Sequence, residues 1–434
     1  MSVHRKERIG RNMKLCRSAL CGGVGLNTVR TDRFKTAHLT VNLFVPLRRE
    51  TASAYSLLTD VLMRGTEQYP TMRDLNRRQD ELYSLGLGAY VQKKGEAQLV
   101  TFELTCIDDA YAFDGMHVLK EGMKLLQELI FRPCTENGVF REIYVEQEKK
   151  NLADDIRSRI DHKASYARRR CIEIMCEGEP YAVDHGGDVE EVEKQTASSL
   201  WEIYRSLLTS ARVEIFYIGK KTEEEVADLC KQYLPFSPRE ASFPATVQGS
   251  APAEPRRVTE QMRISQCKLS VGFRAPYTLQ AGNFAKMSLF NEVFGGSPSS
   301  RLFLNVREKK SLCYYCSSGP DGLKGLLMVN SGIEQKNKQA ALNAILEQLD
   351  DLRAGRLTVE ELETARRSLR NGYREITDSP ASICSWYLGR ISAGRTDSPE
   401  EMAKSLDEVT VADVVKVAND LTLDTVYYLE GASE

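Results

Sequence analysis

The feature that most constrains the fold is a weak internal repeat with a period of about 220 residues. The segment LLTDVLMRGTEQYPTM in the first half resembles SLFNEVFGGSPSSRLF in the second half, with Gly65 aligned to Gly296. Residues 161–165 align in the same way with residues 378–382. A period of this length is typical of duplicated domains, because the repeats of solenoids span only about 20–50 residues. We therefore expect two homologous domains that face each other like a clamshell.

Hydrophobic patterning predicts an α+β fold for each half. Strand patterns occur at residues 35–47, 82–91, 98–107 and 213–220, and return at 264–273, 311–318 and 325–333. Helical spacing occurs at residues 52–64, 111–131, 137–159 and 223–234. The order mixes hairpins with pairs of helices, which favours α+β over an alternating α/β arrangement.

The two halves are separated by a segment that resembles a linker. Residues 237–257 are rich in proline, alanine, serine and charged residues and show no apolar periodicity. This composition predicts a first domain over residues 1–236 and a second domain over residues 258–434.

Composition excludes several classes of function. The 434 residues carry a formal net charge of −2, so charge offers no argument for binding nucleic acid or membranes. The chain lacks the run of about 18 apolar residues that a membrane span needs, and its basic N-terminus lacks the apolar core of a secretory signal. The 11 cysteines are scattered and odd in number, which indicates reduced thiols. We expect a cytoplasmic protein.

The segment YSLLTDVLMRGTEQYP, residues 55–70, has the outline of a zinc-protease helix. A catalytic zinc needs about three protein ligands and a neighbouring glutamate, and an H-x-x-E-H motif supplies two histidines and that glutamate from one helix. The segment resembles the one that carries this inverted motif in insulinase and pitrilysin-type zinc metallopeptidases. The resemblance places Ser56 and Asp60 at the histidine positions and Thr59 at the position of the general base.

The resemblance also locates the third ligand position, in the helix EQEKKNLADDIRSRIDHK. By its spacing from Glu148, the matching residue is Asp155. One or two carboxylates do not replace two imidazoles for zinc. We therefore expect no zinc, no other cofactor and no catalytic residue in this chain.

The second half resembles the same family through GGSPSSRLFLNVREKKSLCYYCSS. In active members the arginine and tyrosine of this motif contact the substrate, which implies that role for Arg307 and Tyr314. A local alternative is that Arg307 pairs with Glu308 or Glu292 while Tyr314 packs on a strand.

The family also binds extended peptides along an edge strand of the first half, which corresponds here to residues 87–91. This resemblance implies peptide contacts for Gly88, Ala89 and Tyr90. Backbone hydrogen bonds dominate such contacts, so the side chains place few constraints on the peptide.

The resemblance covers nearly the whole chain, including residues 185–220, and is strongest to the bacterial YmfF-like group of inactive homologues. It implies a non-catalytic subunit that binds a peptide or small protein and pairs with a homologous, zinc-bearing partner. A homodimer is possible for the isolated chain. Two alternatives remain open. One is a stand-alone peptide-binding chaperone or scaffold. The other is a hydrolase using Ser56 and Asp60, which is disfavoured because no nearby histidine or lysine can serve as the base.

Overall fold

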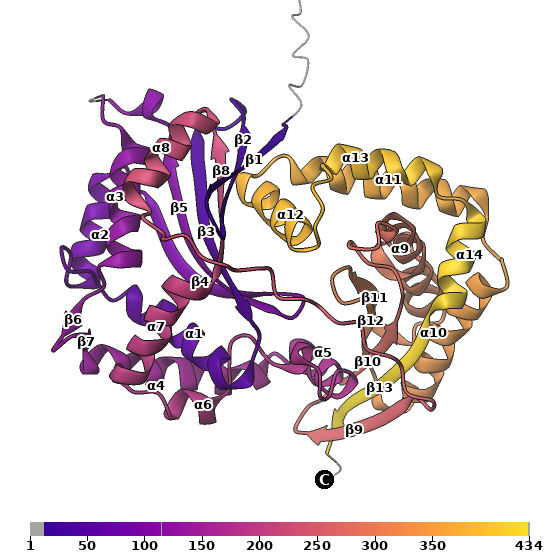
Figure 1. Cartoon of the computed structure of the whole chain (residues 1–434). Coiled ribbons are helices and arrows are strands. Elements are labelled where there is room, and N and C mark those ends of the chain that lie inside the picture. Colours follow the sequence, from indigo (N-terminus) through magenta and orange to yellow (C-terminus); the bar gives the residue numbers. More distant parts are fainter. Residues whose placement is uncertain (1–12, 114, 433–434) are drawn as a thin grey trace, which may run out of the picture.

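Each half of the chain forms one β-sheet with helices packed against it, in the computed structural model that describes residues 13–113 and 115–432 (Figure 1). The first sheet has six strands in the order β1-β2-β8-β3-β5-β4. These strands are β1 Leu15–Cys21, β2 Val24–Arg30, β3 Thr36–Pro46, β4 Gly86–Lys94, β5 Ala97–Ile107 and β8 Arg212–Gly219. The combination of helices with largely antiparallel sheets confirms the predicted α+β class.

The second sheet repeats the arrangement of the first. Its five strands have the order β11-β12-β10-β13-β9, and they are β9 Arg256–Met262, β10 Cys267–Arg274, β11 Cys313–Asp321, β12 Leu326–Ile333 and β13 Thr422–Gly431. The two strand orders match when the first sheet is followed from β4 and the second from β11. Each sheet then has an edge hairpin, two further antiparallel pairings and a parallel pair, which is β8 with β2 in the first sheet and β13 with β9 in the second. This shared topology confirms that the two halves are duplicated domains.

The first half contains eight α-helices among the described residues, and all of them except α5 belong to the layer beside the six-stranded sheet. The eight helices are α1 Arg49–Leu62, α2 Met72–Glu81, α3 Val118–Phe131, α4 Glu142–Ser158, α5 Lys163–Met175, α6 Val189–Glu193, α7 Ala197–Ser210 and α8 Glu223–Tyr233. The start of α8 follows from a capping box, since the Thr222 hydroxyl accepts a hydrogen bond from the Glu225 amide at 3.3 Å.

The second half contains α9 Phe284–Asn291, α10 Lys338–Arg353, α11 Val359–Ile376, α12 Pro380–Ser392, α13 Pro399–Ser405 and α14 Val411–Asp420. Two π-helical segments, Glu292–Gly296 and Leu302–Lys309, follow α9. Short 3₁₀ turns occupy Asp109–Tyr111, Arg159–Asp161, Pro180–Ala182, Gln335–Asn337 and Leu406–Glu408. Among the described residues, no helix is both long enough and apolar enough to cross a membrane.

Each half places one helix on the sheet of the other half (Figure 1). Helix α5 packs on β10 and β13, where Cys171 and Tyr427 share a buried apolar cluster. Helix α12 packs on β3 and β8, where Tyr387 and Phe216 share another. The repeated segments 161–165 and 378–382 lead directly into these two helices. The exchange therefore joins the two halves through apolar contacts on both sheets.

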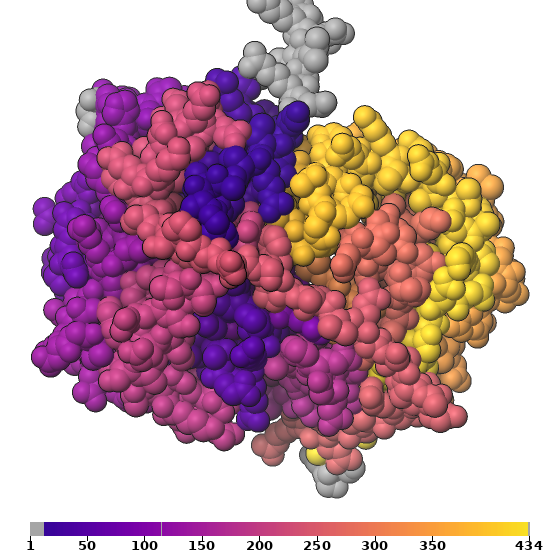
Figure 2. Space-filling view, viewed as in Figure 1, coloured from indigo at the N-terminus to yellow at the C-terminus, as the bar shows by residue number. Residues whose placement is uncertain are grey.

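The connection between the halves is extended but held in place. Residues 234–255 contain no helix or strand and cross the visible face of the molecule (Figure 2). The Thr246 hydroxyl accepts a hydrogen bond from the Glu96 amide at 3.0 Å, and the Val247 amide donates to the Glu96 carboxylate at 3.2 Å. Strand β9 begins at Arg256, so the last two residues of the segment predicted as a linker belong to the second sheet.

Two predicted helical stretches begin later than expected. The stretch at 111–131 is helical only from Val118, because the Asp109 carboxylate accepts the Leu119 amide at 3.3 Å and turns the chain before α3. The stretch at 137–159 opens with a hairpin between β6 Thr135–Glu136 and β7 Val139–Phe140, and α4 follows. Asn137 and Gly138 have φ values of 53° and 83°, as the tight turn of a two-residue hairpin requires.

Candidate functional site

Helix α1 carries the three positions that the sequence aligned with the zinc motif. The helix lies between β4 and β5 on one side and α4, α6 and α7 on the other, and 10 of its 14 residues are buried. Ser56 and Thr59 are 7% and 3% exposed. The Thr59 hydroxyl donates to the Ser56 carbonyl oxygen at 2.7 Å, so it is engaged within the helix.

A tight loop after α1 explains the Gly-Thr and Tyr-Pro residues of the motif. A Cβ atom on Gly65 would approach the Pro70 carbonyl group at 2.6 Å, so only glycine fits there. The Thr66 amide donates to the Tyr69 carbonyl oxygen at 2.8 Å. The Tyr144 hydroxyl of α4 donates to the Pro70 carbonyl oxygen at 3.0 Å. The loop thus holds the end of α1 against α4.

Helix α4 presents a buried carboxylate to this region. Glu148 is 8% exposed and accepts hydrogen bonds from Arg64 at 3.1 Å and from the Asn151 side-chain amide at 3.0 Å. The Arg64 guanidinium also lies 4.9 Å from the centre of the Tyr144 ring. Both oxygens of Glu148 therefore have partners that compensate its burial.

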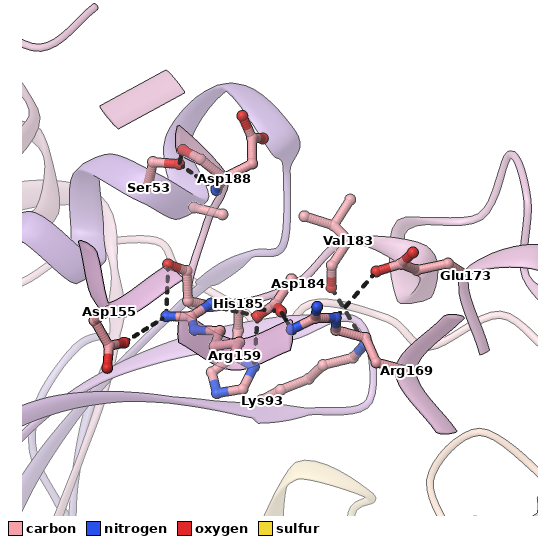
Figure 3. A network of polar contacts seen from close by, with 12 residues as sticks. Ser53, Lys93, Asp155, Arg159, Arg169, Glu173, Val183, Asp184, His185 and Asp188 are labelled. Carbon is pink, nitrogen blue, oxygen red and sulfur yellow. Dashed lines mark hydrogen bonds and ion pairs between the residues drawn. The ribbon is translucent and has the colours of Figure 1, made fainter. Parts of the chain in front are cut away.

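Arg159 connects Asp155 to the loop that precedes α6 (Figure 3). Its guanidinium lies 3.3 Å from the Asp155 carboxylate and 3.5 Å from that of Asp184. The same guanidinium donates to the Gly186 carbonyl oxygen at 3.4 Å. The carboxylate at the third ligand position is thus paired with an arginine.

Asp60 differs from the other acids of the site. It forms no hydrogen bond or ion pair with any other described residue. Burial, together with the nearby charges of Glu148 and Asp155, raises the pKa of Asp60 to about 6. This carboxyl group therefore exchanges its proton near neutral pH.

His185 also faces this region, which corrects an expectation from the sequence. Its Nδ1 lies 3.8 Å from the Asp184 carboxylate, and burial lowers the pKa of His185, so the imidazole is neutral at pH 7. The expectation that no histidine lies near Ser56 was wrong. No hydrogen bond joins Ser56 to His185 in the part of the chain that the structure describes, so a nucleophile and base pair is not formed.

These side chains line one cavity of about 460 Å³ beside α1. Its lining residues are Ser56, Thr59, Asp60, Ala89, Tyr90, Val91, Glu148, Asn151, Leu152, Asp155, Arg159, His185 and Gly186. One wall is β4, which pairs only with β5 and is therefore an edge strand of the first sheet. The cavity brings the degenerate ligand positions and two of the three predicted peptide-contact residues together, and Gly88 lies on the same strand.

Arg307 and Tyr314 lie elsewhere on the molecule. Arg307 is on the π-helical segment Leu302–Lys309 and Tyr314 is on β11, and neither lines the cavity beside α1. The Arg307 side chain is 39% exposed and lies 3.5 Å from the Glu308 carboxylate and 4.6 Å from the centre of the Phe303 ring. Tyr314 is 56% exposed. Both side chains are thus open to a second molecule.

The donor set beside α1 does not suit zinc. Ser56 and Thr59 offer hydroxyl groups, and the Asp155 carboxylate is held by Arg159. Within residues 13–113 and 115–432, no group of three or more histidine, cysteine, aspartate or glutamate side chains has the geometry to hold a metal ion. A zinc protease needs about three such ligands and an open position for water. Zinc-dependent hydrolysis therefore cannot be assigned to these residues.

A duplicated α+β fold with a degenerate zinc site defines an inactive relative of zinc metallopeptidases, and comparison with known proteins agrees. The peptidase M16 inactive domain matches residues 194–369. The probable inactive metalloprotease YmfF of Bacillus subtilis is 33% identical over 411 residues, which cover 94% of this chain and 96% of that protein. The chain belongs to the peptidase M16 family, and it resembles this probable inactive metalloprotease along nearly its whole length.

Three further matches are informative. The uncharacterized zinc protease YmxG, also from Bacillus subtilis, is 26% identical over 66% of this chain and 66% of that protein. The crystal structure of a conserved protein from Enterococcus faecalis has a TM-score of 0.90 at 30% identity, and covers 97% of this chain and 99% of that one. The peptidase M16 inactive domain structure from Pseudomonas fluorescens has a TM-score of 0.80 at 17% identity. The last match supports the fold alone.

Proposed function

We propose that this chain is a non-catalytic M16 subunit that binds an extended peptide along β4 and works with a homologous, zinc-bearing partner. One observation carries the proposal: the free edge of β4 borders a cavity whose catalytic positions are Ser56, Thr59 and Asp60. The edge strand that can hold a peptide is therefore present, whereas the two histidines and the glutamate of the zinc motif are replaced.

The edge of β4 is suited to strand addition. Its outer backbone groups have no partner strand, because β4 pairs with β5 alone among the described strands. A Cβ atom built on Gly88 would meet no other atom within 4 Å, so the strand is open there. Tyr90 is 41% exposed. An added peptide would gain backbone hydrogen bonds, with the cavity taking alternate side chains.

The exposed position of Arg307 and Tyr314 supports contacts of both side chains with a second molecule. A guanidinium group offers a planar pair of donors to a carbonyl or carboxylate, and a phenol donates one directional hydrogen bond. The one ion-pair partner of Arg307 among the described residues is the exposed side chain of Glu308. Neither group is committed to the core of the protein, so both can serve a substrate held between two subunits.

The relatives also favour a pair of unlike subunits. Bacillus subtilis contains both a probable inactive metalloprotease and an uncharacterized zinc protease that resemble this chain. We propose the cytoplasm as the site of action, an assignment supported by 11 free thiols within the described residues. A stand-alone peptide-binding chaperone or scaffold is the alternative outcome of the experiment below.

The test combines this chain with a zinc-bearing M16 homologue from the same organism. We expect a complex on size-exclusion chromatography, and cleavage of unstructured peptides that is faster in the complex than with the homologue alone. Arg307→Ala and Tyr314→Phe should each lower turnover per assembled complex by about tenfold, since each removes a hydrogen bond to the substrate. Arg367→Ala, at an exposed arginine of α11, is the matched control and should have no effect.

Three results would contradict the proposal. Cleavage by the isolated chain would show that it is itself a peptidase. Normal turnover by both variants would show that Arg307 and Tyr314 do not contribute to cleavage of the substrate. Peptide binding by the isolated chain, without any complex with the homologue, would establish the chaperone or scaffold instead.

A further inference from the structure

A second cavity, of about 470 Å³, lies at the junction of the two halves. The first half contributes Lys93 and Lys94 at the end of β4 and Gly95 in the turn that follows. The other walls come from the second half, chiefly α9, α11, α12 and the turn after β11. It shares no lining residue with the cavity beside α1. The proposed peptide-binding role makes no use of it.

Arg390, on α12, is a buried cation without a counterion in this cavity. Its side chain is 6% exposed, and its Nε atom is buried with no hydrogen-bond partner. No described residue forms an ion pair or side-chain hydrogen bond with it. Its guanidinium lies 3.1 Å from the centre of the Trp386 ring. Burial lowers the pKa of Arg390 to about 10. A buried charge in this condition is costly unless a partner joins it.

Lys94 brings a second unpaired cation to the cavity, from the first half of the chain. Burial lowers the pKa of Lys94, and no described residue forms a hydrogen bond or ion pair with its ammonium group. The neighbouring Lys93 is different, because its ammonium group donates to the carbonyl oxygens of Tyr181 and Val183. Two cations, one from each half, thus face the cavity with their donors free.

The nearby acids are engaged with other partners. The Asp321 carboxylate accepts the Tyr181 hydroxyl at 2.5 Å and the Leu323 amide at 2.8 Å. The Asp397 carboxylate, which lies near Arg390, is paired with Arg395 at 2.6 and 2.7 Å. Asp321 offsets part of the positive charge, but the lining holds three cations, Lys93, Lys94 and Arg390, against this one acid.

The rest of the lining combines aromatic and aliphatic side chains with the polar side chains of Ser288 and Asn291. Phe284, Tyr373 and Trp386 contribute rings, and Leu279, Leu323 and Leu369 contribute aliphatic side chains. Tyr373 and Trp386 meet edge to face with centroids 5.4 Å apart, and the Trp386 Nε1 group donates to the Asp397 carbonyl oxygen at 2.8 Å. Apolar walls with a few convergent polar groups are typical of sites for small ligands.

We propose that this cavity binds a carboxylate ligand with an aromatic body, the chemistry of a peptide that ends in an aromatic residue. The carboxylate is held by Arg390 and Lys94, and the ring packs against Trp386 and Phe284. A guanidinium and an ammonium group form strong charge-assisted hydrogen bonds with a carboxylate. Because one cation belongs to each half, the bound ligand also bridges the two domains.

The test uses N-acetyl-L-phenylalanine, which is too short to add a strand to β4, and its uncharged amide. The full chain carries Trp201→Phe, which leaves Trp386 as the single tryptophan reporter, since the sequence has two. We expect saturable quenching by the acid and at least about tenfold weaker binding of the amide. Arg390→Gln and Lys94→Gln should each weaken binding of the acid by a similar factor. Lys231→Gln, at an exposed lysine of α8, is the matched control.

Equal affinity for acid and amide, or unchanged binding by both variants, would overturn the proposal. Competition by inorganic phosphate at the same concentrations as the acid would also overturn it, and would indicate a phosphate site.

Thermal unfolding of Arg390→Met separates a ligand site from a structural role. Removing an unpaired buried charge should leave the melting temperature of the unliganded protein unchanged or raise it, and should abolish the shift caused by the acid. A large drop in melting temperature, together with no shift by the acid in the parent protein, would assign Arg390 to packing against Trp386 and overturn the proposal.

Discussion

The Lys324 ammonium group and the Glu96 carboxylate form an ion pair at the junction of the two halves, where their side chains are 0% and 5% exposed. Lys324 lies in the turn between β11 and β12, and Glu96 lies in the turn between β4 and β5. The same ammonium group lies 2.5 Å from the Glu179 carboxylate and donates to the Val247 carbonyl oxygen. The equivalent edge hairpins of the two sheets therefore meet at one buried cation.

Lys324→Met should lower the free energy of unfolding by about 3–5 kcal/mol, because it leaves the buried Glu96 carboxylate without a counterion. Glu179, in contrast, keeps Arg274 at 2.6 Å. Urea unfolding followed by circular dichroism measures the change. Lys231→Met, at an exposed lysine, serves as the control and should be nearly neutral. The double variant Lys324→Met, Glu96→Gln should recover part of the lost free energy of unfolding, because the buried carboxylate is then replaced by a neutral amide. An unchanged midpoint in Lys324→Met would show that the pair does not join the halves.

Asp60→Asn should stabilise the protein at neutral pH. Because the pKa of Asp60 is raised to about 6 in the folded state, the folded protein binds the proton more tightly than the unfolded chain does. The parent protein therefore loses stability as the pH rises from about 4 to 6, and the asparagine variant does not share this loss. Partial exposure screens the charge, so we expect a gain of about 1–2 kcal/mol at pH 7.5.

Melting temperatures of the parent protein and Asp60→Asn at pH 4.0, 5.0, 6.0 and 7.5 measure this effect, and the difference should grow across the series. Asp154→Asn is the control, since that side chain is 60% exposed and paired with Arg157 on the outer face of α4. A difference that is constant with pH would show that Asp60 has an ordinary pKa.

Purified protein should contain no stoichiometric zinc, because the two imidazole positions hold the Ser56 hydroxyl and the Asp60 carboxyl group, and the carboxylate of Asp155 is paired with Arg159. Restoring the site should require Ser56→His, Thr59→Glu and Asp60→His together, with Asp155→Glu. Elemental analysis after dialysis should find about one zinc per chain in that variant and far less in each single variant. One tightly held zinc in the unmodified protein would refute this prediction.

Cys313 should be a reactive thiol. A hydrogen bond with the Cys316 thiol lowers the pKa of Cys313 to about 7, and the nearby Arg307 guanidinium acts in the same direction. Since the thiolate is the reacting form, alkylation of Cys313 by iodoacetamide should slow by about tenfold from pH 8 to pH 6. Peptide mass spectrometry gives the rate at this position. Cys316→Ala should slow the alkylation of Cys313 at pH 7. An unchanged rate would show that the hydrogen bond with Cys316 does not lower the pKa of Cys313.

Several features of the molecule could be predicted because their signals are local in the chain. Gly65, Thr66, Tyr69 and Pro70 build a short loop from contacts among neighbours, so the motif was visible without its zinc ligands. The α+β class followed from patterns that repeat within each element. The Asn137-Gly138 hairpin had an equally local signal that the helical periodicity on either side obscured.

The sequence by itself determined the duplication, the fold class and the loss of the zinc ligands, because each depends on residue identity at short or aligned separations. Only the tertiary structure decided that α5 and α12 exchange sheets, that His185 joins the cavity beside α1, and that Arg390 and Lys94 face one cavity. An amphipathic pattern shows that a helix has an apolar face, but not which sheet covers it. That choice depends on contacts between residues far apart in the chain, such as Cys171 with Ser270 at a separation of 99 and Thr40 with Cys384 at a separation of 344.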